Sequence, residues 1–291
     1  MIQEAEIQIR KYFRVCGWSS ISDDKGNAYF YKNRHPNQIK GGDFLGYSKK
    51  KGYVSDLEVV SILEEGLSES YERKNTNDIV RPDGSTTFFI TSGIQHFENI
   101  LFNGEIPNEG PSFFVQPVIR TNYRDSVGEG RVSSFVNLST VRFNCSLDQY
   151  IEDLDGWMDS LSKLGLYMGD FIFKLKHRKV DLESDNFWRK NEGLGVSCSY
   201  GGLGLGDASY HSLTGQEDKP FEDIGFGLER IVWARNKNPT FVEVVGVFPY
   251  AFLQNILEID TLRTISFLRL FRPRRVLLWL QVSWTLGLLS S

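Results

Sequence analysis

Three stretches rich in β-branched and aromatic residues place the strongest constraint on how this chain folds. They cover residues 86–91, 113–119 and 132–143, and apolar and polar side chains partly alternate within them. Such residues favour strands, and alternation with a period of two places one set of side chains on the buried face of a sheet. Residues 171–176 alternate in the same way. The sequence therefore predicts a largely antiparallel β-sheet.

Two capping-box patterns predict where helices begin. Ser55 is followed three residues later by a glutamate, and Ser146 is followed three residues later by a glutamine. In this pattern the serine hydroxyl and the later side chain each accept a backbone N–H at the first turn of a helix. We expect helices over about residues 55–73 and 146–164. Helices packed on one side of a mostly antiparallel sheet define an α+β fold.

The N-terminal part contains one further helix and a less regular segment. Residues 3–16 have amphipathic spacing and are followed by Gly17, which predicts a helix with a glycine stop. Residues 20–53 are polar and rich in glycine. They predict a hairpin or an irregular excursion, with a short strand at residues 28–31. Residues 75–85 predict a loop, and no repeat period is visible along the chain.

A strand-to-helix junction at residues 221–230, Phe-Glu-Asp-Ile-Gly-Phe-Gly-Leu-Glu-Arg, is the clearest candidate for a ligand site. Gly225 and Gly227 carry no Cβ, so the backbone there can lie close to a ligand or to another strand. The residues from Leu228 onward predict the first turns of a helix, where Arg230 would present a planar guanidinium to a phosphate. Glycines also occur at ordinary strand ends, so this short motif predicts a nucleotide site only together with other motifs.

Composition excludes several classes of function. The chain has 291 residues, of which 33 are basic and 37 are acidic, giving a net charge of −4. This balance excludes a generally basic nucleic-acid surface, so we expect no DNA partner, although a local basic groove stays open. The three cysteines and four histidines are scattered and predict neither a disulfide framework nor a zinc site. The first residues lack the regions of a signal peptide, and we expect a cytoplasmic protein.

The C-terminal end differs from the rest of the chain. After Asp260 there are five arginines and no acidic residue. Residues 276–289 are apolar, but this run is shorter than the ~20 residues that a membrane-spanning helix needs. A membrane anchor, a packed final helix and a frameshifted or truncated end are the open interpretations, and a membrane anchor is the least favoured of them.

Several short stretches follow one another in an order typical of one known family. They include residues 5–17, 88–97 (Phe-Phe-Ile-Thr-Ser-Gly-Ile-Gln-His-Phe), 116–120 (Gln-Pro-Val-Ile-Arg), 185–188 (Asp-Asn-Phe-Trp), 223–231 and 260–263. In this order they resemble the catalytic core of alanyl-tRNA synthetases, which are class II aminoacyl-tRNA synthetases. Residues 116–120 with Arg124 resemble the strand and loop of motif 2, and residues 223–231 resemble motif 3.

The resemblance implies a fold, a division of the chain and a set of ligands. The fold would be a class II antiparallel sheet flanked by helices. Residues 1–255 would form the catalytic domain, with residues 20–84 as an expanded insertion, and residues 256–291 would begin a helical region with an aberrant or truncated tail. The ligands would be ATP, Mg²⁺ bridging its phosphates, and an amino acid, and the chain would form a homodimer.

The resemblance also implies how ATP is held. Forming an aminoacyl adenylate requires positive charge at the α-phosphate and restraint of the pyrophosphate leaving group. Arg120 would contact the α-phosphate and the amino acid carboxylate, Arg124 would assist with the phosphates, and Arg230 would hold the γ-phosphate. Phe135 would stack on adenine. Asn137 occupies the position of a family glutamate that reads the adenine amino group.

Four further residues complete the expected site. Asp223 would pair with the substrate α-amino group, Trp188 would wall the side-chain pocket, and Gly225 and Gly227 would let ATP approach the backbone. Each residue type also has an ordinary structural role, because loop arginines are usually solvated, aromatic residues usually pack in cores, and an aspartate before a glycine is common in turns.

Two departures from the family leave the substrate open. The family's Glu-Ile-Trp-Asn segment is missing from residues 202–210, and residues 193–198 replace its Gly-Pro-Cys-Gly-Pro-Cys run. Both segments line the amino acid pocket in the family. We expect an ATP-dependent, adenylate-forming ligase that releases pyrophosphate and transfers the amino acid to tRNA or another acceptor. The alternatives are a catalytically silent paralogue that binds or regulates a partner, and a biosynthetic ligase with a non-tRNA acceptor.

Overall fold

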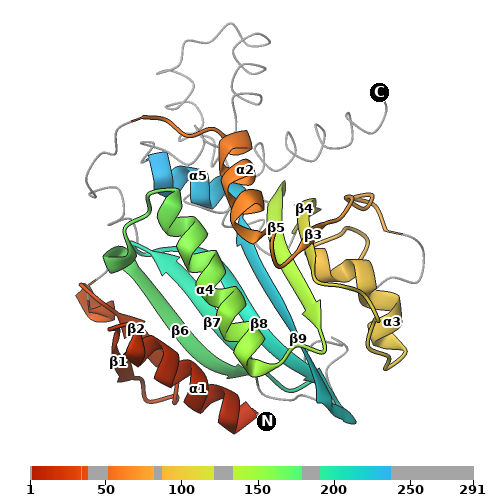
Figure 1. Cartoon of the computed structure of the whole chain (residues 1–291), viewed down its shortest axis with the longest axis horizontal. Helices are drawn as coiled ribbons and strands as arrows, with labels where there is room; N and C mark the ends of the chain where they lie inside the picture. The colour runs from red at the N-terminus through yellow and green to blue at the C-terminus, as the bar shows by residue number, and fades with distance from the viewer. Residues whose placement is uncertain are drawn as a thin grey trace, which may run out of the picture.

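The computed structural model of the protein describes residues 2–33, 35–38, 52–81, 87–120, 134–178 and 191–236. Within this part of the chain, nine strands form one sheet in the order β1-β2-β6-β7-β8-β9-β5-β4-β3 (Figure 1). The strands are β1 (Ser19–Ser22), β2 (Ala28–Tyr31), β3 (Glu72–Arg73), β4 (Ser112–Ile119), β5 (Ser134–Phe143), β6 (Phe171–Arg178), β7 (Gly193–Tyr200), β8 (Leu203–Leu213) and β9 (Gln216–Gly227). Neighbouring strands are antiparallel except β3 and β4, which are parallel. The predicted α+β fold with a largely antiparallel sheet is confirmed.

Five α-helices lie in the described part of the chain, and all but the third were predicted from the sequence. They are α1 (Ile2–Val15), α2 (Asp56–Leu67), α3 (Glu98–Phe102), α4 (Leu147–Lys163) and α5 (Leu228–Asn236). Both capping boxes form, because the hydroxyl of Ser55 accepts the Glu58 N–H and the hydroxyl of Ser146 accepts the Gln149 N–H. Gly17 follows α1 with a φ of 77°, a left-handed conformation that glycine adopts readily at a helix end. The predicted hairpin is also present as β1 and β2.

The main core lies between one face of the sheet and the helices α1, α2, α4 and α5. Figure 1 shows α1 and α4 lying across the strands on this side. Trp157 of α4 stacks on Phe226 of β9 with ring centres 4.7 Å apart, and its indole N–H donates to the hydroxyl of Thr140 on β5. Successive side chains of a strand point to opposite faces. Asp223, Gly225 and Gly227 therefore lie on the face of β9 away from these helices.

A smaller core covers one end of that second face. A 3₁₀ helix, Gly93–Phe97, continues directly into α3, and the two supply Ile94, Phe97 and Leu101. These side chains pack against apolar residues of β4, β5, β8 and β9, such as Phe114 and Phe221. The rest of the second face carries the polar residues described in the next subsection. The helices α1, α2, α4 and α5 thus cover one face of the sheet, and the opposite face is left partly open.

Two predicted elements differ from the structure. The helix expected to reach residue 73 ends at Leu67. Tyr71 then turns into the interior and donates a hydrogen bond to Glu222, and the next two residues form β3 beside β4. Long-range pairing has overridden the local helical pattern. Leu57, in the first turn of α2, is 83% exposed.

Residues 86–91 were predicted as a strand, and this prediction is wrong for the described residues. Phe89 forms only an isolated bridge with Val80. The side chain of Gln95 accepts the backbone N–H of Thr91 at 2.6 Å, and the chain turns there into the 3₁₀ helix instead of extending. Residues 193–206, a glycine-rich run with no predicted element, supply β7 and the start of β8.

Other predictions fall on residues that are outside the described ones. These are the arginine-rich loop with Arg124, the segment with Trp188, and residues 237–291, which include the proposed boundary at residues 255–256. In the described part of the chain, no helix has the length and apolar character needed to cross a membrane.

Candidate active site

A cavity of about 570 Å³ opens on the face of the sheet away from the main core. Its floor comes from the middle strands of the sheet, and its walls come from the start of α5 and from the segment around Thr91. The volume lies within the range of small-molecule sites. The cavity brings together seven residues that the sequence analysis selected: Arg120, Phe135, Asn137, Asp223, Gly225, Gly227 and Arg230.

These seven residues come from three separate parts of the chain. Arg120 follows β4, Phe135 and Asn137 lie on β5, and the others lie on β9 and α5. Antiparallel pairing of β5 with β9 sets Asn137 opposite Gly227. The structure thus places these predicted site residues in one cavity, whereas Arg124 and Trp188 lie outside the described residues.

Arg120 is held at the edge of the cavity by two contacts. Its Nε donates to the carbonyl oxygen of Thr91 at 2.9 Å. Its guanidinium carbon lies 5.0 Å from the centre of the Phe135 ring, which is the geometry of a cation–π contact. These contacts orient the planar guanidinium, and one face of the Phe135 ring is turned to Arg120.

Arg230 reaches from the first turn of α5 across to β8. Its Nη1 donates to the carbonyl oxygen of Gly204 at 2.9 Å. A Cβ added at Gly227 would lie 3.6–3.9 Å from the side-chain carbons of Arg230, so the arginine packs directly over the glycine backbone. Arg230 and Arg120 therefore place two positive charges on the same cavity.

Asn137 is almost fully buried, and its amide binds backbone on both sides. Its Oδ1 accepts the N–H of Gly93 at 3.1 Å, and its Nδ2 donates to the carbonyl oxygen of Phe226 at 3.4 Å. The side chain thus ties β5 to the 3₁₀ helix and to β9. This observed contact set is structural, and the role of Asn137 toward adenine stays a prediction.

Comparisons with known proteins give the context for this cavity. No family model matches the chain. The chain is 24% identical over 271 residues to the alanine–tRNA ligase of Methanoregula boonei, and the match covers 84% of this chain and 29% of that protein. The chain therefore spans less than a third of the length of this relative. Two solved structures of pyrrolysyl-tRNA synthetase from Desulfitobacterium hafniense are also similar. Each has a TM-score of 0.45, with 17% and 15% identity over 64% and 66% of this chain and 68% and 73% of those chains.

The alignment with a tRNA ligase extends along most of the chain, and the α+β fold and the order of the motif residues agree with it. The chain has a class II aminoacyl-tRNA synthetase-like core. Residues 223–231, which resemble motif 3, form the end of β9 and the start of α5, and residues 116–119, which resemble the motif 2 strand, form the end of β4.

Glu229 of the synthetase-like core was not selected from the sequence, although it precedes Arg230 in the same motif. Its carboxylate accepts the N–H of Val136 at 2.9 and 3.2 Å, which joins the first turn of α5 to β5. Burial raises the pKa of Glu229 to about 7, although the hydrogen bond from Val136 opposes this shift. The residue lines the cavity and fixes the helix that carries Arg230.

Lys176 and Asp207 are two further cavity residues that the sequence analysis missed. The Lys176 ammonium donates to the hydroxyl of Ser197 at 2.9 Å and lies 3.4 Å from Oδ1 of Asp207. Alternation in residues 171–176 indicated that Lys176 lies on one face of its strand, but not that this face is the cavity floor.

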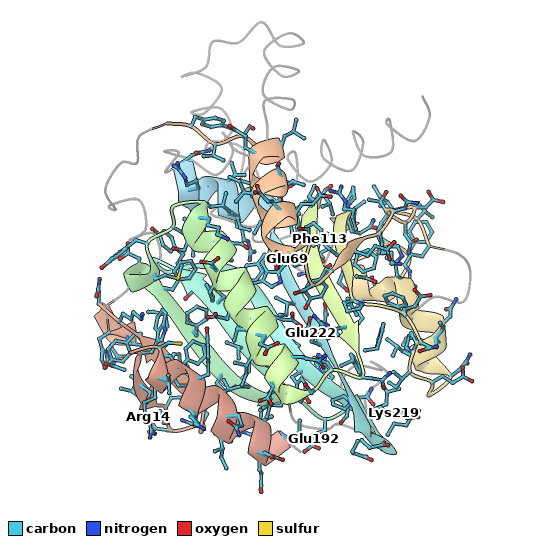
Figure 2. All side chains as sticks on the ribbon, viewed as in Figure 1. Arg14, Glu69, Phe113, Glu192, Lys219 and Glu222 are labelled. Carbon is cyan, nitrogen blue, oxygen red and sulfur yellow. The ribbon has the colours of Figure 1, made fainter. Side chains whose placement is uncertain are left out.

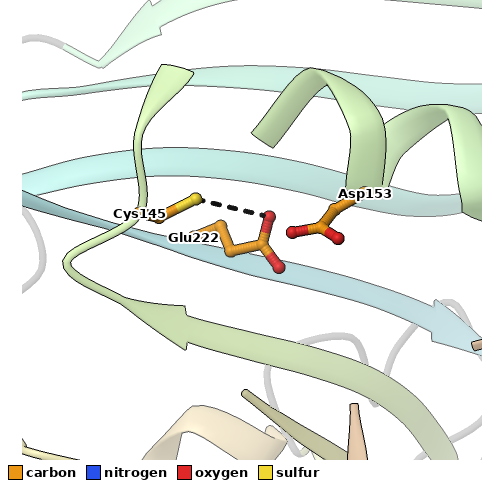
Figure 3. A group of neighbouring side chains, drawn as sticks. All are labelled: Cys145, Asp153 and Glu222. Atoms are coloured by element: carbon orange, nitrogen blue, oxygen red, sulfur yellow. Dashed lines mark hydrogen bonds between the residues drawn. The ribbon is translucent and has the colours of Figure 1, made fainter. Parts of the chain in front are cut away.

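A cluster of ionisable residues lies on the helix-covered face of the sheet, between β9 and α4. Figure 2 labels Glu222 in the interior of the molecule, and Figure 3 shows Cys145 and Asp153 beside it. Ligand atoms of these three residues lie within 4.8 Å of one another. Arg142 already binds both oxygens of Asp153, at 2.7 and 2.9 Å, and Tyr71 donates to Glu222.

This cluster is not suited to a metal ion. Burial and the neighbouring charge of Glu222 raise the pKa of the Cys145 thiol, and burial and the charge of Asp153 raise the pKa of Glu222 well above its usual value. Metal ligation requires the deprotonated forms. The Arg142 guanidinium supplies the positive charge instead, so the cluster serves to join α4 to the sheet.

Proposed function

We propose that the protein binds ATP and an amino acid in this cavity and joins them as an aminoacyl adenylate. A carboxylate oxygen of the amino acid attacks the α-phosphorus of ATP. The bond from the α-phosphorus to the oxygen that bridges to the β-phosphate breaks, and pyrophosphate leaves. The observation that carries the proposal is the convergence of Arg120 with Asp223 and Arg230, from two distant parts of the chain, on one cavity.

The two arginines take the phosphate end of ATP in this proposal. Arg120 stabilises the negative charge that develops at the α-phosphate, and Arg230 holds the γ-phosphate so that pyrophosphate is restrained as it leaves. The contacts of Arg120 with Thr91 and of Arg230 with Gly204 support these roles, because both guanidinium groups are oriented by the protein itself. Phe135 offers an aromatic surface to adenine, and Arg124, outside the described residues, adds a further positive charge.

The amino acid lies toward β8 in this proposal. Asp223 binds the α-ammonium group, because a carboxylate on the cavity floor is the expected partner of a cation. Trp188 closes the side-chain pocket. Gly225 and Gly227 bear no side chain between Asp223 and the arginines, so the adenylate can lie close to the backbone.

Mg²⁺ enters as a companion of ATP rather than as a resident metal. Among the described residues, the three-ligand cluster of Cys145, Asp153 and Glu222 lies behind the sheet, not in the cavity. Mg²⁺ prefers few protein carboxylates together with substrate phosphates and water. The ion would arrive with ATP and offset negative charge on its phosphates.

Transfer to tRNA, homodimer formation and a cytoplasmic location belong to the same proposal. Transfer to tRNA is supported by the similarity to an alanine–tRNA ligase, of which the chain matches 29%. Because the match covers only this part of the relative, the identity of the amino acid and that of the final acceptor are tested separately from adenylate formation.

Amino-acid-dependent exchange of pyrophosphate into ATP tests the proposal. The full chain is assayed with each of the twenty amino acids and Mg²⁺. We expect exchange with at least one amino acid, and a loss of about 100-fold or more in Arg120→Ala and in Arg230→Ala, since removing one donor to a developing charge costs about 10²–10³-fold. Absence of exchange with a folded, ATP-binding protein would contradict the proposal.

One observation favours a second candidate, a silent paralogue that binds a ligand or partner without catalysis. The amide of Asn137 is bound to Gly93 and Phe226, so it holds the scaffold where the family has an adenine-reading glutamate. Equilibrium ATP binding by the wild type and by Arg230→Ala separates the candidates. Binding that depends on Arg230, without exchange for any amino acid, supports the silent paralogue.

A further inference from the structure

We propose that the part of the cavity beyond Asp223, formed by Ser209, Asp207 and Lys176, receives a neutral polar amino acid side chain. Such a side chain carries both a hydrogen-bond donor and an acceptor, as a carboxamide or a hydroxyl does. The inference rests on the proposed function, which sets the α-ammonium group of the substrate at Asp223. It concerns the class of amino acid, which the similarity to an alanine–tRNA ligase leaves open.

The register of the sheet gives the direction in which the substrate side chain extends. On β9, Gly227 pairs with Asn137 of β5, on the side of the proposed ATP site. On its other edge, Asp223 pairs with Ser209 of β8, and Gly225 pairs with Asp207. Adjacent strands lie about 4.8 Å apart. A substrate held at Asp223, with its carboxylate toward the Gly227 end of β9, can therefore extend its side chain across β8 toward Lys176.

A glycine on β7 lets Lys176 reach this floor from β6. Gly195 pairs with Lys176 on one side and with Ser209 on the other. A Cβ added at Gly195 would lie 3.1 Å from Cε of Lys176, so the lysine side chain passes directly over the glycine. Its ammonium group then contacts Ser197 at 2.9 Å and Asp207 at 3.4 Å. The cavity floor beyond Asp223 therefore holds an ammonium donor beside a carboxylate acceptor.

The opposite charges of Lys176 and Asp207 determine which substrate side chains can bind here. The side chains of Lys176 and Asp207 are 47% and 58% exposed, so both retain polar atoms that face open space. An apolar side chain would remove water from these groups without replacing its hydrogen bonds. A charged side chain would be attracted to one member of this pair but repelled by the other, which lies only 3.4 Å away. A carboxamide or hydroxyl accepts from Lys176 and donates to Asp207 at once.

Pyrophosphate exchange with a matched panel tests the inference. Serine, threonine, asparagine and glutamine are compared with alanine and valine, using the full chain. We expect kcat/KM to be about 10- to 100-fold higher for at least one polar member than for the apolar ones, the range for one or two hydrogen bonds to charged groups. Lys176→Met and Asp207→Ala should remove most of this preference while the KM for ATP is unchanged.

Lys174→Met is the matched control. Lys174 lies two residues earlier on β6 and places its ammonium group 5.1 Å from the centre of the Tyr29 ring, and it does not line the cavity. This variant should leave the preference unchanged. A preference for alanine or valine, or an unchanged preference in Lys176→Met, overturns the inference.

A binding measurement separates this inference from the proposed function. The same amino acids are titrated by calorimetry in the presence of a non-hydrolysable ATP analogue. Polar members that bind in the wild type and lose affinity in Lys176→Met support the polar subsite, even if no exchange occurs and adenylate formation fails. Tighter binding of the apolar members, or binding of no amino acid, overturns the polar subsite whatever the exchange assay gives.

Discussion

The guanidinium of Arg120 lies 5.0 Å from the centre of the Phe135 ring, while its Nε donates to the carbonyl oxygen of Thr91. This pairing uses the planar shape of arginine as well as its charge. We expect Arg120→Lys to lower kcat/KM for ATP in the exchange assay by about 10-fold or more. A lysine keeps the positive charge but lacks the planar guanidinium that stacks on Phe135 and donates in fixed directions.

The companion variant for this prediction is Phe135→Leu. It keeps an apolar side chain but removes the ring that orients Arg120, so kcat/KM for ATP should fall in the same direction. The free energy of unfolding, measured by urea titration, should change little for Arg120→Lys. Wild-type exchange kinetics in Arg120→Lys would show that the charge alone matters.

Gly93 lies against Ser139 so closely that a side chain has no room there. A Cβ at Gly93 would overlap Oγ of Ser139 and lie 3.2 Å from the Phe114 ring. We expect Gly93→Ala to lower the free energy of unfolding by about 1–3 kcal/mol, the usual cost of overpacking. Adding Ser139→Ala to this variant should restore part of the loss, because it removes the nearest overlapping atom.

Gly156, on α4, is the control for the glycine substitution. A Cβ at Gly156 meets nothing within 4 Å. Gly156→Ala should therefore raise the free energy of unfolding by about 0.5–1 kcal/mol, since alanine restricts the unfolded chain and favours helix. Equal stability losses in Gly93→Ala and Gly156→Ala would contradict the packing explanation.

Arg142 and Asp153 form a two-fold hydrogen-bonded ion pair behind the sheet, with side chains 15% and 4% exposed. Removing one partner leaves a buried charge without compensation. We expect Arg142→Met to cost about 3–5 kcal/mol of unfolding free energy. The double variant Arg142→Met with Asp153→Leu should cost less than Arg142→Met alone, because no unpaired charge remains. Additive losses in urea titrations would count against this account.

The sequence predicted the elements whose signals are local. Both capping boxes form at Ser55 and Ser146 because a serine and the residue three positions later meet within one helical turn. The glycine run at residues 193–206 gave no such signal, because glycine has low strand propensity. Its strands depend on packing with distant residues: a Cβ at Gly206 would overlap the backbone of Gly225, and Gly195 lies beneath Lys176.

The candidate site shows the same division. The motif residues that were selected, such as Arg120 and Arg230, meet in one cavity because the order of the motifs carries long-range information. Lys176 and Asp207 were missed, since their place on the cavity floor depends on the register of β6, β7 and β8. The backbone contacts of Asn137 were equally invisible, because Gly93 and Phe226 approach it only in the folded chain.

The buried carboxyl of Glu229 makes stability depend on pH. Burial raises its pKa from the usual 4.5 to about 7 in the folded protein. Below pH 4.5 both the folded and unfolded states hold the proton, so this contribution to stability is complete. Between pH 4.5 and 7 the unfolded state releases the proton first, and the contribution is lost as the pH rises.

Glu229→Gln isolates this effect, because glutamine still offers an oxygen to the N–H of Val136. We expect the free energy of unfolding of the variant, relative to wild type, to rise between pH 5 and pH 7.5 by up to about 3 kcal/mol. Urea titrations across this range measure it. Glu65→Gln, at an exposed glutamate of α2, controls for the loss of one charge. A difference between Glu229→Gln and wild type that stays flat with pH would show that Glu229 is already ionised in the folded protein at pH 5.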